Sequence, residues 1–495
     1  MIDLTIRRDE STPLHEQIVS GLRRLIATGR LPDGAHLPPS RQLASDLGVN
    51  RGTVVQAYER LQAEGLAEGH VGRGTVVCSA AGHGAAAAQR LSWPAVLGPA
   101  DAVSAARAAA VAEDFTEKAH ISFAAGFPSS ELYPMAQTVR AMTRLLRSRG
   151  GRLLSEGPVQ GLPELRAAVA DELGCGPNEV FVVSGSQQGL YLLGRALLRR
   201  GDAVVTEVPT YLGALQVFQE VGARVIGLPI DEEGMDPAML EDVLSRMTVR
   251  LLYTVPTFQN PTGASLSLER RRAVLELAYR YGVPIVEDDP YALLAYDGEC
   301  PPTLRSLDQQ GHVLYVGTCS KTLFPGLRVG WVTAPEPLVK RLVPMKLRMD
   351  LFTSPLAQAV VTALRAAPEY GRHLNGLRDA YRSRREAMVA GLRRHCPGIA
   401  FSVPRGGYFI WGRLPEDVAA AHLLRESTHE GVSFLPGEFF YPEGQSEEAV
   451  RLTFASEPEE RIHEGTARLG RALRRVAEQG RVAASGGVHQ VEPIV

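Results

Sequence analysis

Three short stretches near the start of the chain carry apolar residues at every third or fourth position, the spacing of helices that bury one face. Thr12 and Pro13 are expected to cap and open the first helix. We expect Ser40 to cap the second helix, Gly48 to end it in the left-handed conformation, and Asn50 to open the third. The inward-facing positions are Leu14, Ile18, Leu22, Leu25 and Ile26 in the first helix, Leu43 and Leu47 in the second, and Val54, Tyr58 and Leu61 in the third.

A β-hairpin and a linker are predicted after these helices. Between Leu66 and Val77, short apolar runs alternate with glycines, as in two strands joined by a tight turn. The order helix, helix, turn, helix, hairpin predicts a winged helix-turn-helix domain over residues 1–78. Residues 79–118 are rich in alanine and glycine and lack periodicity, which predicts a flexible linker.

The rest of the chain alternates strand-like apolar runs with helical segments. This alternation is typical of an α/β domain with a mostly parallel, doubly wound sheet. Near Leu351 the pattern changes to helices, and from Phe401 it predicts a smaller α+β subdomain. We assign residues 119–480 to this domain and residues 481–495, which lack periodicity, to a disordered tail. The strand-like runs are Val180–Val183, Ala203–Glu207, Arg250–Val255, Pro284–Glu287 and Val313–Gly317.

The composition is that of a globular protein with a large core, since 45% of the 495 residues are hydrophobic and 22% are charged. A chain of this length is expected to form two or three domains. Its charged N-terminus excludes a signal peptide, and no apolar run is long enough to cross a bilayer. We therefore expect a cytoplasmic protein without membrane contact. The five cysteines are scattered and never spaced as CxxC, so neither a disulfide framework nor a metal site is indicated.

Polar residues at the start of the third helix are candidates for contacts with DNA. In a helix-turn-helix this end meets base edges, while the preceding helix lies on the phosphate backbone. Arg51, Thr53 and Gln56 occupy that end, and the forked guanidinium of Arg51 suits guanine. Arg41 is a candidate for the DNA backbone, and Arg73 at the hairpin tip for the minor groove. The alternative for any one of these arginines is a solvated residue on a protein-interaction module.

The charge of the N-terminal domain indicates how it would bind DNA. The chain has a formal net charge of −2, and its first 78 residues hold nine arginines against nine acidic residues. DNA binding must therefore depend on a few placed arginines and on dimerisation. The run LPPSRQLASDLGVNRGTVVQAYERLQAEGLAEGHVGRGTVV, from Leu37 to Val77, closely resembles the winged helix of GntR-type regulators. The resemblance begins at Pro13 and implies that this domain binds DNA.

The motif GTCSKTLFPGLRVGW follows the last of the strand-like runs and carries a lysine. Pyridoxal 5′-phosphate needs a lysine that forms an imine, a carboxylate at its ring nitrogen, donors for its phosphate and an aromatic cover. Lys321 in this turn is the candidate lysine, and Arg328 can return to the phosphate. Gly185, Ser186 and Gln187 open a helix directly after a strand, so their backbone N–H groups are expected to meet the phosphate.

Further motifs supply the other parts of such a site. Asp288 lies at the end of an apolar strand, where a carboxylate faces the crevice and can keep the ring nitrogen protonated. Asn260 in FQNPTG and Tyr291 in DDPY can hydrogen-bond the phenolic oxygen, and Tyr211 in EVPTY can stack on the ring. Taken singly, each motif also fits a structural turn or strand end. Their order along the chain predicts binding of pyridoxal 5′-phosphate.

From Phe123 to about Leu473 the chain resembles the fold-type I aminotransferases, especially the subgroup of kynurenine and 2-aminoadipate aminotransferases. The resemblance implies that Lys321 forms the imine and that Ser320 also contacts the phosphate. It further implies that Arg451, in VRLTFA, grips the α-carboxylate of a substrate, for which a bidentate guanidinium is suited. The alternative is an arginine on a surface strand.

The two parts together resemble the MocR subfamily of bacterial regulators. This resemblance implies a domain-swapped homodimer on DNA half-sites, whose DNA contacts change when an amino compound exchanges onto Lys321. Glu156 departs from the family, because a tyrosine that reaches the partner's phosphate commonly stands there and a carboxylate would repel phosphate. Gly213 stands where the γ-aminobutyrate sensor has an arginine, so that effector is not favoured. Asn260 is the residue of working aminotransferases, which many regulators of this group lose.

Three functions are consistent with the sequence. The main hypothesis is a regulator that binds pyridoxal 5′-phosphate and senses an amino compound bearing a carboxylate. The alternative is an active aminotransferase that transfers an amino group from an α-amino acid to a 2-oxo acid, since the set of catalytic residues is complete. A third hypothesis is a sensor of the cofactor itself.

Overall fold

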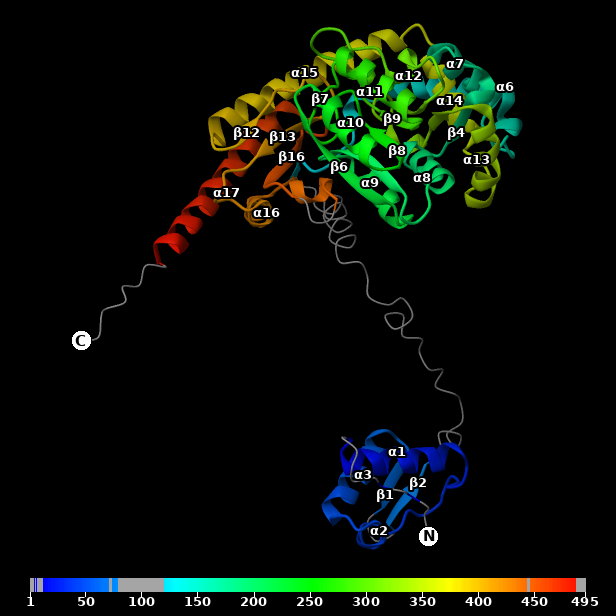
Figure 1. Ribbon diagram of the computed structural model, residues 1–495, viewed down its shortest axis with the longest axis vertical. Coiled ribbons are helices and arrows are strands. Elements are labelled where there is room, and N and C mark those ends of the chain that lie inside the picture. The colour runs from blue at the N-terminus through cyan, green and yellow to red at the C-terminus, as the bar shows by residue number, and fades with distance from the viewer. Residues whose placement is uncertain are drawn as a thin grey trace, which may run out of the picture. The chain divides into compact units, whose positions relative to one another are not determined.

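The computed structural model divides into two compact units, Met1–Ala100 and Asp101–Val495, each with its own core (Figure 1). Arg73 and the predicted linker over residues 79–118 lie outside the described residues. The structure describes residues 4, 6, 12–70, 74–78, 120–442 and 446–486.

The described residues of the first unit form three helices and a two-stranded antiparallel hairpin, as predicted for a winged helix. Asn50 caps the third helix by accepting a hydrogen bond from the Gly52 amide at 2.9 Å, and Gly48 ends the second helix with a φ of 62°. The helices bury their apolar faces in one core around Ile18, Val54 and Leu61. The elements are α1 (Leu14–Ala27), α2 (Ser40–Leu47), α3 (Arg51–Ala63), β1 (Ala67–His70) and β2 (Gly74–Val77).

Two helix starts differ from the prediction. Pro13, and not Thr12, is the N-cap residue of α1, and its carbonyl oxygen accepts the first helical hydrogen bonds. Ser40 is the first residue inside α2, and Pro39 precedes it as the N-cap. The reason is that each proline holds an extended conformation directly before the helix, so the helix begins at the next residue. The Ser40 hydroxyl instead accepts a long hydrogen bond of 3.4 Å from Arg51 Nε.

An eight-stranded sheet organises the second unit. The strands from β10 to β6 pair in parallel, β11 is antiparallel to both of its neighbours, and β7 pairs antiparallel with β6. All five predicted strands are present, which confirms the α/β class and the mostly parallel sheet. In spatial order the strands are β4 (Val180–Val183), β11 (Gly330–Thr333), β10 (Val313–Thr318), β9 (Ile285–Asp289), β8 (Val249–Thr254), β5 (Ala203–Val208), β6 (Arg224–Asp231) and β7 (Gly234–Met235).

Helices cover both faces of this sheet because successive strand residues point to opposite sides. On β10, for example, Leu314 and Val316 pack in the core of one face, while Val313 and Tyr315 pack on the other face. The first face is covered by α8 (Ser186–Leu197), α9 (Leu212–Glu220) and α13 (Glu336–Met349). The opposite face is covered by α6 (Met135–Leu153), α7 (Pro163–Leu173), α10 (Pro237–Arg246), α11 (Leu268–Tyr281) and α14 (Pro355–Arg365).

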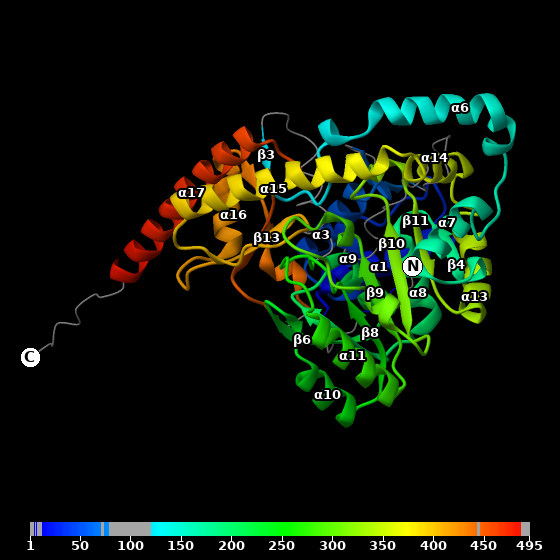
Figure 2. The same cartoon turned by 90° about the horizontal axis from the view of Figure 1, so that it is seen from above.

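A smaller α+β subdomain follows, as predicted. Its sheet has the order β12 (Ala400–Phe401), β13 (Phe409–Arg413), β16 (Ala449–Thr453), β15 (Leu435–Pro436). Beside it, β3 (Ile121–Ser122) pairs with β14 (Val432–Ser433). Figure 2 shows two long helices of this subdomain, α15 and α17, packed side by side. The subdomain's helices are α15 (Tyr370–His395), α16 (Ala420–His429) and α17 (Glu459–Gly486).

The predicted start of the disordered tail is too early. Helix α17 continues to Gly486, so residues 481–486 are helical, and residues 487–495 lie outside the described residues. The cause is local, because the run from Arg481 to Ala484 consists mainly of strong helix formers that extend an existing helix without needing a packed face.

Candidate cofactor site

Lys321 lies in the turn after β10 and reaches a partner far away in the sequence. Its Nζ donates to the carbonyl oxygen of Gly126 at 2.6 Å. The rings of Phe127, Tyr291 and Tyr408 surround the amine, with centroids 5.4–5.9 Å from Nζ. Burial, followed by the positive charge of nearby arginines, lowers the pKa of Lys321 to about 8. A lysine with such a pKa presents far more neutral, nucleophilic amine near neutral pH than an ordinary lysine does.

Asp288 has one carboxylate oxygen without a partner. It lies at the carboxyl end of β9 and is buried, and its Oδ2 accepts a hydrogen bond from the Tyr253 hydroxyl at 2.9 Å. The buried Oδ1 has no hydrogen-bond partner among the residues that the structure describes. Burial raises the pKa of Asp288 to about 7. A buried, unpaired acceptor suits a protonated ring nitrogen, which would return the carboxyl group to its charged form.

The turn between β4 and α8 has the form of an anion site. Gly185 has a φ of 87°, and a Cβ atom at this position would lie 2.3 Å from Nη2 of Arg328. Only glycine therefore allows the guanidinium to approach this closely. Nη2 of Arg328 donates to the carbonyl oxygen of Ser184 at 3.2 Å, which anchors the arginine beside the first turn of α8. Ser186 and Gln187 begin that helix, whose N–H groups favour anions.

Tyr211, Gln187 and Gly213 form one hydrogen-bonded group at the start of α9. The Tyr211 hydroxyl donates to Oε1 of Gln187 at 3.1 Å, and Nε2 of Gln187 donates to the carbonyl oxygen of Gly213 at 2.9 Å. Burial and the charge of Asp288 raise the pKa of Tyr211 to about 12. A Cβ atom at Gly213 would lie 2.6 Å from Cζ of the Tyr211 ring. The observed position of Tyr211 therefore requires glycine at 213.

Arg451 and Asn260 meet inside the second unit. Arg451 on β16 is buried, and its Nη1 donates to Oδ1 of Asn260 at 3.2 Å. Its Nη2 donates to the carbonyl oxygen of Ala124, and the guanidinium lies over the rings of Phe409 and Phe440, 4.3 Å and 5.1 Å from their centroids. This burial contradicts the alternative of a surface arginine. The guanidinium lies in an environment in which a ligand's carboxylate would be bound away from water.

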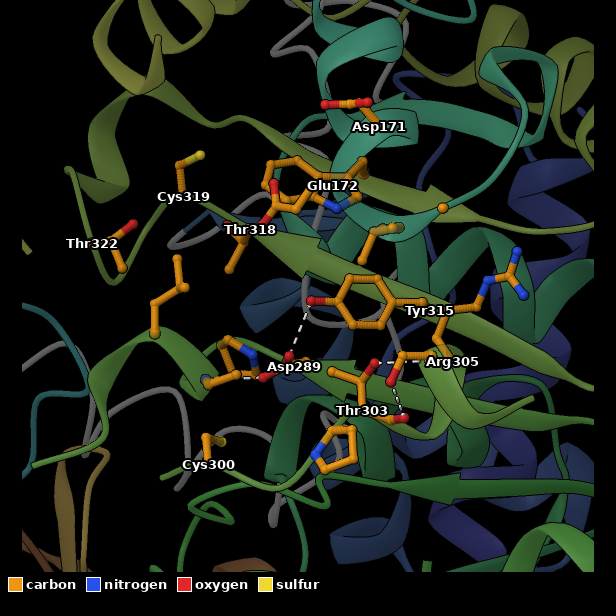
Figure 3. A pocket seen from close by; sticks show the side chains of 18 of the residues that line it. Asp171, Glu172, Asp289, Cys300, Thr303, Arg305, Tyr315, Thr318, Cys319 and Thr322 are labelled. Carbon is orange, nitrogen blue, oxygen red and sulfur yellow. Dashed lines mark hydrogen bonds between the residues drawn. The ribbon is translucent and has the colours of Figure 1, made fainter. Parts of the chain in front are cut away.

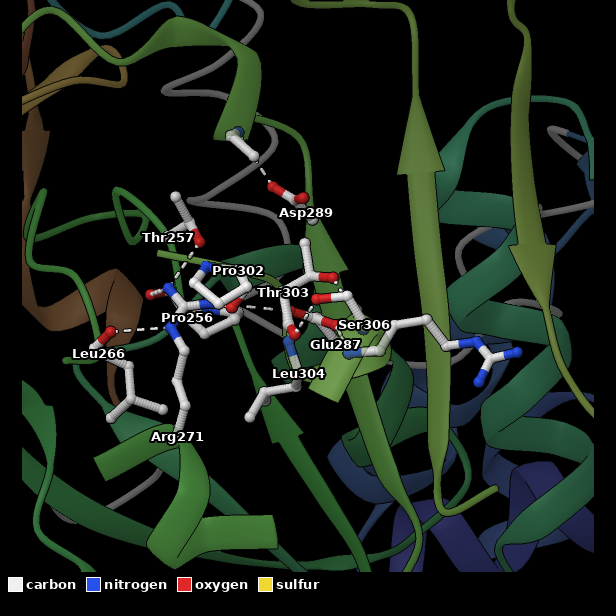
Figure 4. A network of polar contacts seen from close by, with 12 residues as sticks. Pro256, Thr257, Leu266, Arg271, Glu287, Asp289, Pro302, Thr303, Leu304 and Ser306 are labelled. Atoms are coloured by element: carbon white, nitrogen blue, oxygen red, sulfur yellow. Dashed lines mark hydrogen bonds and ion pairs between the residues drawn. The ribbon is translucent and has the colours of Figure 1, made fainter. Parts of the chain in front are cut away.

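A buried polar network holds the loop that carries Asn260 (Figure 4). Arg271 of α11 is fully buried and donates to the carbonyl oxygens of Leu266 and Pro256 at 2.8 Å and 2.7 Å. Its Nη1 lies 3.9 Å from Oε1 of Glu287, which accepts hydrogen bonds from backbone amides of α12 (Leu304–Leu307). Arg271 therefore joins both ends of this loop to β9, the strand of Asp288.

A cavity of about 710 Å³ lies next to this site but is distinct from it (Figure 3). Asp289, Thr318, Cys319 and Thr322 line the cavity, each within two positions of a predicted site residue in the sequence. In Figure 3, Asp289 points toward the hydroxyl of Tyr315, which donates to it at 3.0 Å. Strand alternation accounts for the separation, because consecutive residues of β9 face opposite sides of the sheet.

Several site residues were missed from the sequence. Gly126 and Phe127 lie in the segment between β3 and α6 and have no local signal. Tyr408 directly precedes β13, a strand that was not predicted from the sequence, and its hydroxyl donates to the Lys321 carbonyl oxygen at 2.6 Å. Tyr253 did have a signal, since it is a tyrosine directly after two leucines in a central strand. Ser320 is buried, and its Oγ lies 2.9 Å from that of Thr318.

The residues predicted to contact DNA are accessible in the first unit. Arg41, Arg51 and Gln56 are exposed and Thr53 is half-buried, all on α2 and the first turns of α3. In the second unit, Glu156 is exposed to solvent. Among the described residues, no helix is both long enough and apolar enough to cross a membrane.

Comparison with known proteins assigns a family to each unit. Residues 119–469 match aminotransferase class I and II, and residues 14–77 match the bacterial regulatory proteins of the gntR family. The 2-aminoadipate transaminase of Thermus thermophilus is 39% identical over 358 residues, which are 72% of this chain and 90% of that protein. The crystal structure of LysN, the alpha-aminoadipate aminotransferase of Thermus thermophilus, has a TM-score of 0.72 and 37% identity, covering 75% of this chain and 95% of that one.

Other relatives extend over both units. The HTH-type transcriptional regulator YdfD of Bacillus subtilis is 31% identical over 480 residues, which are 96% of this chain and 99% of that protein. The probable rhizopine catabolism regulatory protein MocR of Rhizobium meliloti is 32% identical over 447 residues, 88% of this chain and 90% of that protein. The chain therefore belongs to the MocR subfamily of GntR-type transcriptional regulators, in which a winged helix is fused to a fold-type I aminotransferase domain.

Proposed function

We propose that this protein is a transcriptional regulator that binds DNA through its winged helix, holds pyridoxal 5′-phosphate at Lys321 and senses an amino compound. The observation that carries the proposal is that the second unit combines the groups that this cofactor requires. A lysine with a lowered pKa, a buried carboxylate with an unpaired oxygen and a glycine turn beside Arg328 occur in a chain that also has a winged helix. The family implies this cofactor.

Each part of the cofactor has residues suited to hold it. Bound cofactor supplies an aldehyde that can exchange from lysine to an incoming amine, and a ring that withdraws electrons. Oδ1 of Asp288 would accept from the ring nitrogen, and the ring of Tyr211 would cover one face. Asn260 and Tyr291 would hydrogen-bond the phenolic oxygen. The phosphate would be held by Gly185, Ser186, Gln187, Ser320 and Arg328.

The chain's own residues select the effector. Near neutral pH a fraction of Lys321 is neutral, so its amine can bond covalently and can later accept a proton. Arg451 would bind a carboxylate of the effector, and Phe409 and Phe440 keep its guanidinium from water. We therefore propose an amino compound that also bears a carboxylate. The position of Tyr211 leaves no space for a side chain at Gly213. The effector's carboxylate therefore has no arginine to bind at position 213, and Arg451 is the residue proposed to bind it.

The DNA-binding part of the proposal rests on the exposed start of α3. Arg51, Thr53 and Gln56 would read bases, and Arg41 and Arg73 would contact the DNA backbone and the minor groove. We propose a cytoplasmic homodimer that binds two operator half-sites. The nine arginines of residues 1–78 are balanced by nine acidic residues, so one domain alone has no net positive charge that would hold it on DNA.

A second function is supported by the hydrogen bond between Arg451 and Asn260 and by the aminotransferases among the relatives. These residues would let the protein transfer an amino group to a 2-oxo acid. The two functions differ in the fate of the cofactor, which a regulator retains in its aldehyde-derived form and an aminotransferase converts to the amine form.

The deciding experiment follows the visible absorbance of the cofactor-loaded protein while a panel of amino acids and amines is added. A lasting spectral change without amino transfer supports the sensor and identifies the effector. Steady conversion that a 2-oxo acid reverses shows an aminotransferase. If no amine changes the spectrum while DNA binding still depends on the cofactor, the protein senses the cofactor itself.

A further inference from the structure

A second lysine of the aminotransferase unit is fully buried behind the β4–α8 turn. Lys346 lies near the end of α13, and its side chain has 0% exposure. Its Nζ donates to Oε1 of Gln188 at 2.9 Å and to the two carboxylate oxygens of Asp350 at 2.8 Å and 2.9 Å. Burial of an ammonium group costs free energy unless the group is paired and hydrogen-bonded. The burial of Lys346 therefore depends on Gln188 and Asp350.

The partners of Lys346 converge on one residue, Ser184. Oδ2 of Asp350 accepts hydrogen bonds from the Ser184 hydroxyl and from Nε2 of Gln188, both at 2.8 Å. Oε1 of Gln188 accepts from the Ser184 amide at 2.8 Å. The remaining polar atom of Ser184, its carbonyl oxygen, accepts from Arg328 at 3.2 Å. Every polar group of Ser184 is thus fixed by this network or by the arginine.

The position of Ser184 determines the shape of the anion site. It directly precedes Gly185, the N-cap residue of α8, whose backbone packs too closely against Arg328 to admit a Cβ atom. A small shift of Ser184 would therefore displace both the first amides of α8 and the guanidinium. Hydrogen-bond donors lose most of their effect when they are misplaced by about an ångström.

We propose that Lys346 is a positioning residue for the cofactor's 5′-phosphate. It acts through Gln188 and Asp350, which hold Ser184 and hence the turn and Arg328. The ion pair of Lys346 and Asp350 is neutral as a whole, so its effect on the phosphate is one of geometry. This inference rests on the proposed binding of pyridoxal 5′-phosphate and adds to it a group that lies outside the site.

The same helix provides a matched control. Lys340 forms an ion pair with Glu336 of α13 at 2.8 Å and with the same four-residue spacing, but their side chains are 73% and 46% exposed. Exposed pairs of this kind contribute little to stability. Lys340→Met therefore removes an equivalent pair from the same helix and leaves the turn at Gly185 untouched.

The test compares two ligands, pyridoxal 5′-phosphate and pyridoxal, which lacks the phosphate. Their dissociation constants are measured from the visible absorbance for the full-length wild type, Lys346→Met and Lys340→Met. We expect Lys346→Met to weaken binding of the phosphate form by roughly tenfold or more and to leave pyridoxal nearly unchanged. Lys340→Met should behave as wild type for both ligands.

Gln188→Met keeps the ion pair of Lys346 and Asp350 but removes the side-chain hydrogen bond to the Ser184 amide, so it tests the proposal if Lys346→Met does not fold. The same selective loss is expected. Equal losses for both ligands, no loss, or the selective loss in Lys340→Met would overturn the inference. A wild type that fails to bind pyridoxal 5′-phosphate would instead overturn the proposed function.

Discussion

The proposed DNA-binding face and the proposed cofactor site of this protein are built in opposite ways. Arg41, Arg51 and Gln56 are exposed on two consecutive helices of one short stretch. The cofactor site is buried and consists of segments that are distant in the sequence. Lys321 forms a hydrogen bond with Gly126, 195 residues away, and Arg451 forms one with Asn260, 191 residues away. A local motif thus presents the first set of residues, whereas the second set exists only when the whole domain folds.

This difference has chemical consequences. Exposed arginines act through shape and hydrogen bonding with their ordinary charge. In the cofactor site, burial lowers the pKa of Lys321 to about 8 and raises that of Asp288 to about 7. The long-range site is therefore the reactive one, and substitutions in the two regions should affect separate properties.

The largest difference between the effects on the cofactor site and on the DNA-binding face is expected for Lys321→Ala. Loss of the amine should abolish the covalent bond to the cofactor, because the structure brings no other lysine into hydrogen-bond contact with Gly126 in the described part of the chain. Borohydride reduction followed by mass spectrometry of the peptides measures the bond, with Lys340→Ala as the control. A cofactor still attached covalently to the Lys321→Ala protein would contradict the assignment.

Arg451→Met should weaken binding of a carboxylate-bearing amino compound by roughly tenfold or more, since charge-assisted hydrogen bonds are lost. Arg451→Lys should recover part of this loss, because lysine keeps the charge but lacks the fork. Spectral titration measures both variants, and an amine without a carboxylate serves as the control ligand. If the control amine loses affinity equally, the arginine does not select the carboxylate.

Arg51→Ala should cost about 1–3 kcal/mol of binding free energy with DNA from the protein's own promoter region, because a bidentate contact with a base is lost. Cofactor binding should not change. Fluorescence anisotropy with labelled DNA, at fixed salt concentration, measures the effect. Unchanged affinity would disprove the placement of the recognition helix.

The rate at which Lys321 reacts should depend on pH and on the charged residues near it. Reaction of the cofactor-free protein with pyridoxal should reach half of its maximum rate near pH 8, well below the ordinary lysine value of about 10.4. The charge of Asp288 raises this pKa and that of Arg451 lowers it. Asp288→Asn should therefore shift the midpoint down and Arg451→Met should shift it up. Shifts in the same direction would refute this electrostatic account.

The smallest effect is expected in the local motif. Asn50→Ala removes the side-chain cap of α3 and should lower the free energy of unfolding of the winged helix by about 1 kcal/mol. Hydrogen exchange of the α3 amides in the full-length protein measures the change, and the amides of α8 serve as an internal reference. Faster exchange at α8 would show that the two units are not independent.

The sequence predicted the parts that depend on local periodicity and strand order. The five strands, the start of the third helix at Asn50 and the left-handed Gly48 are confirmed. Ser40 and Thr12 were misassigned as caps because a proline precedes or follows each of them, and the proline backbone sets the helix start. The end of α17 was missed because helix propensity, and not hydrophobic periodicity, accounts for its last residues.

The features that could not be predicted from the sequence depend on contacts between residues far apart in the chain. The bond from Lys321 to Gly126 and the rings around the lysine depend on tertiary packing. In the sequence Lys346 is one more charged residue of an amphipathic helix, although folding buries it completely. Nothing in local spacing distinguishes it from the exposed Lys340.

We propose that amine exchange at Lys321 controls DNA binding. It is tested most directly by titrating one amino compound into cofactor-loaded protein while cofactor absorbance and the anisotropy of labelled promoter DNA are recorded in the same sample. We expect both signals to change over the same concentration range, as linkage requires. A complete spectral change with constant DNA affinity would contradict the claim.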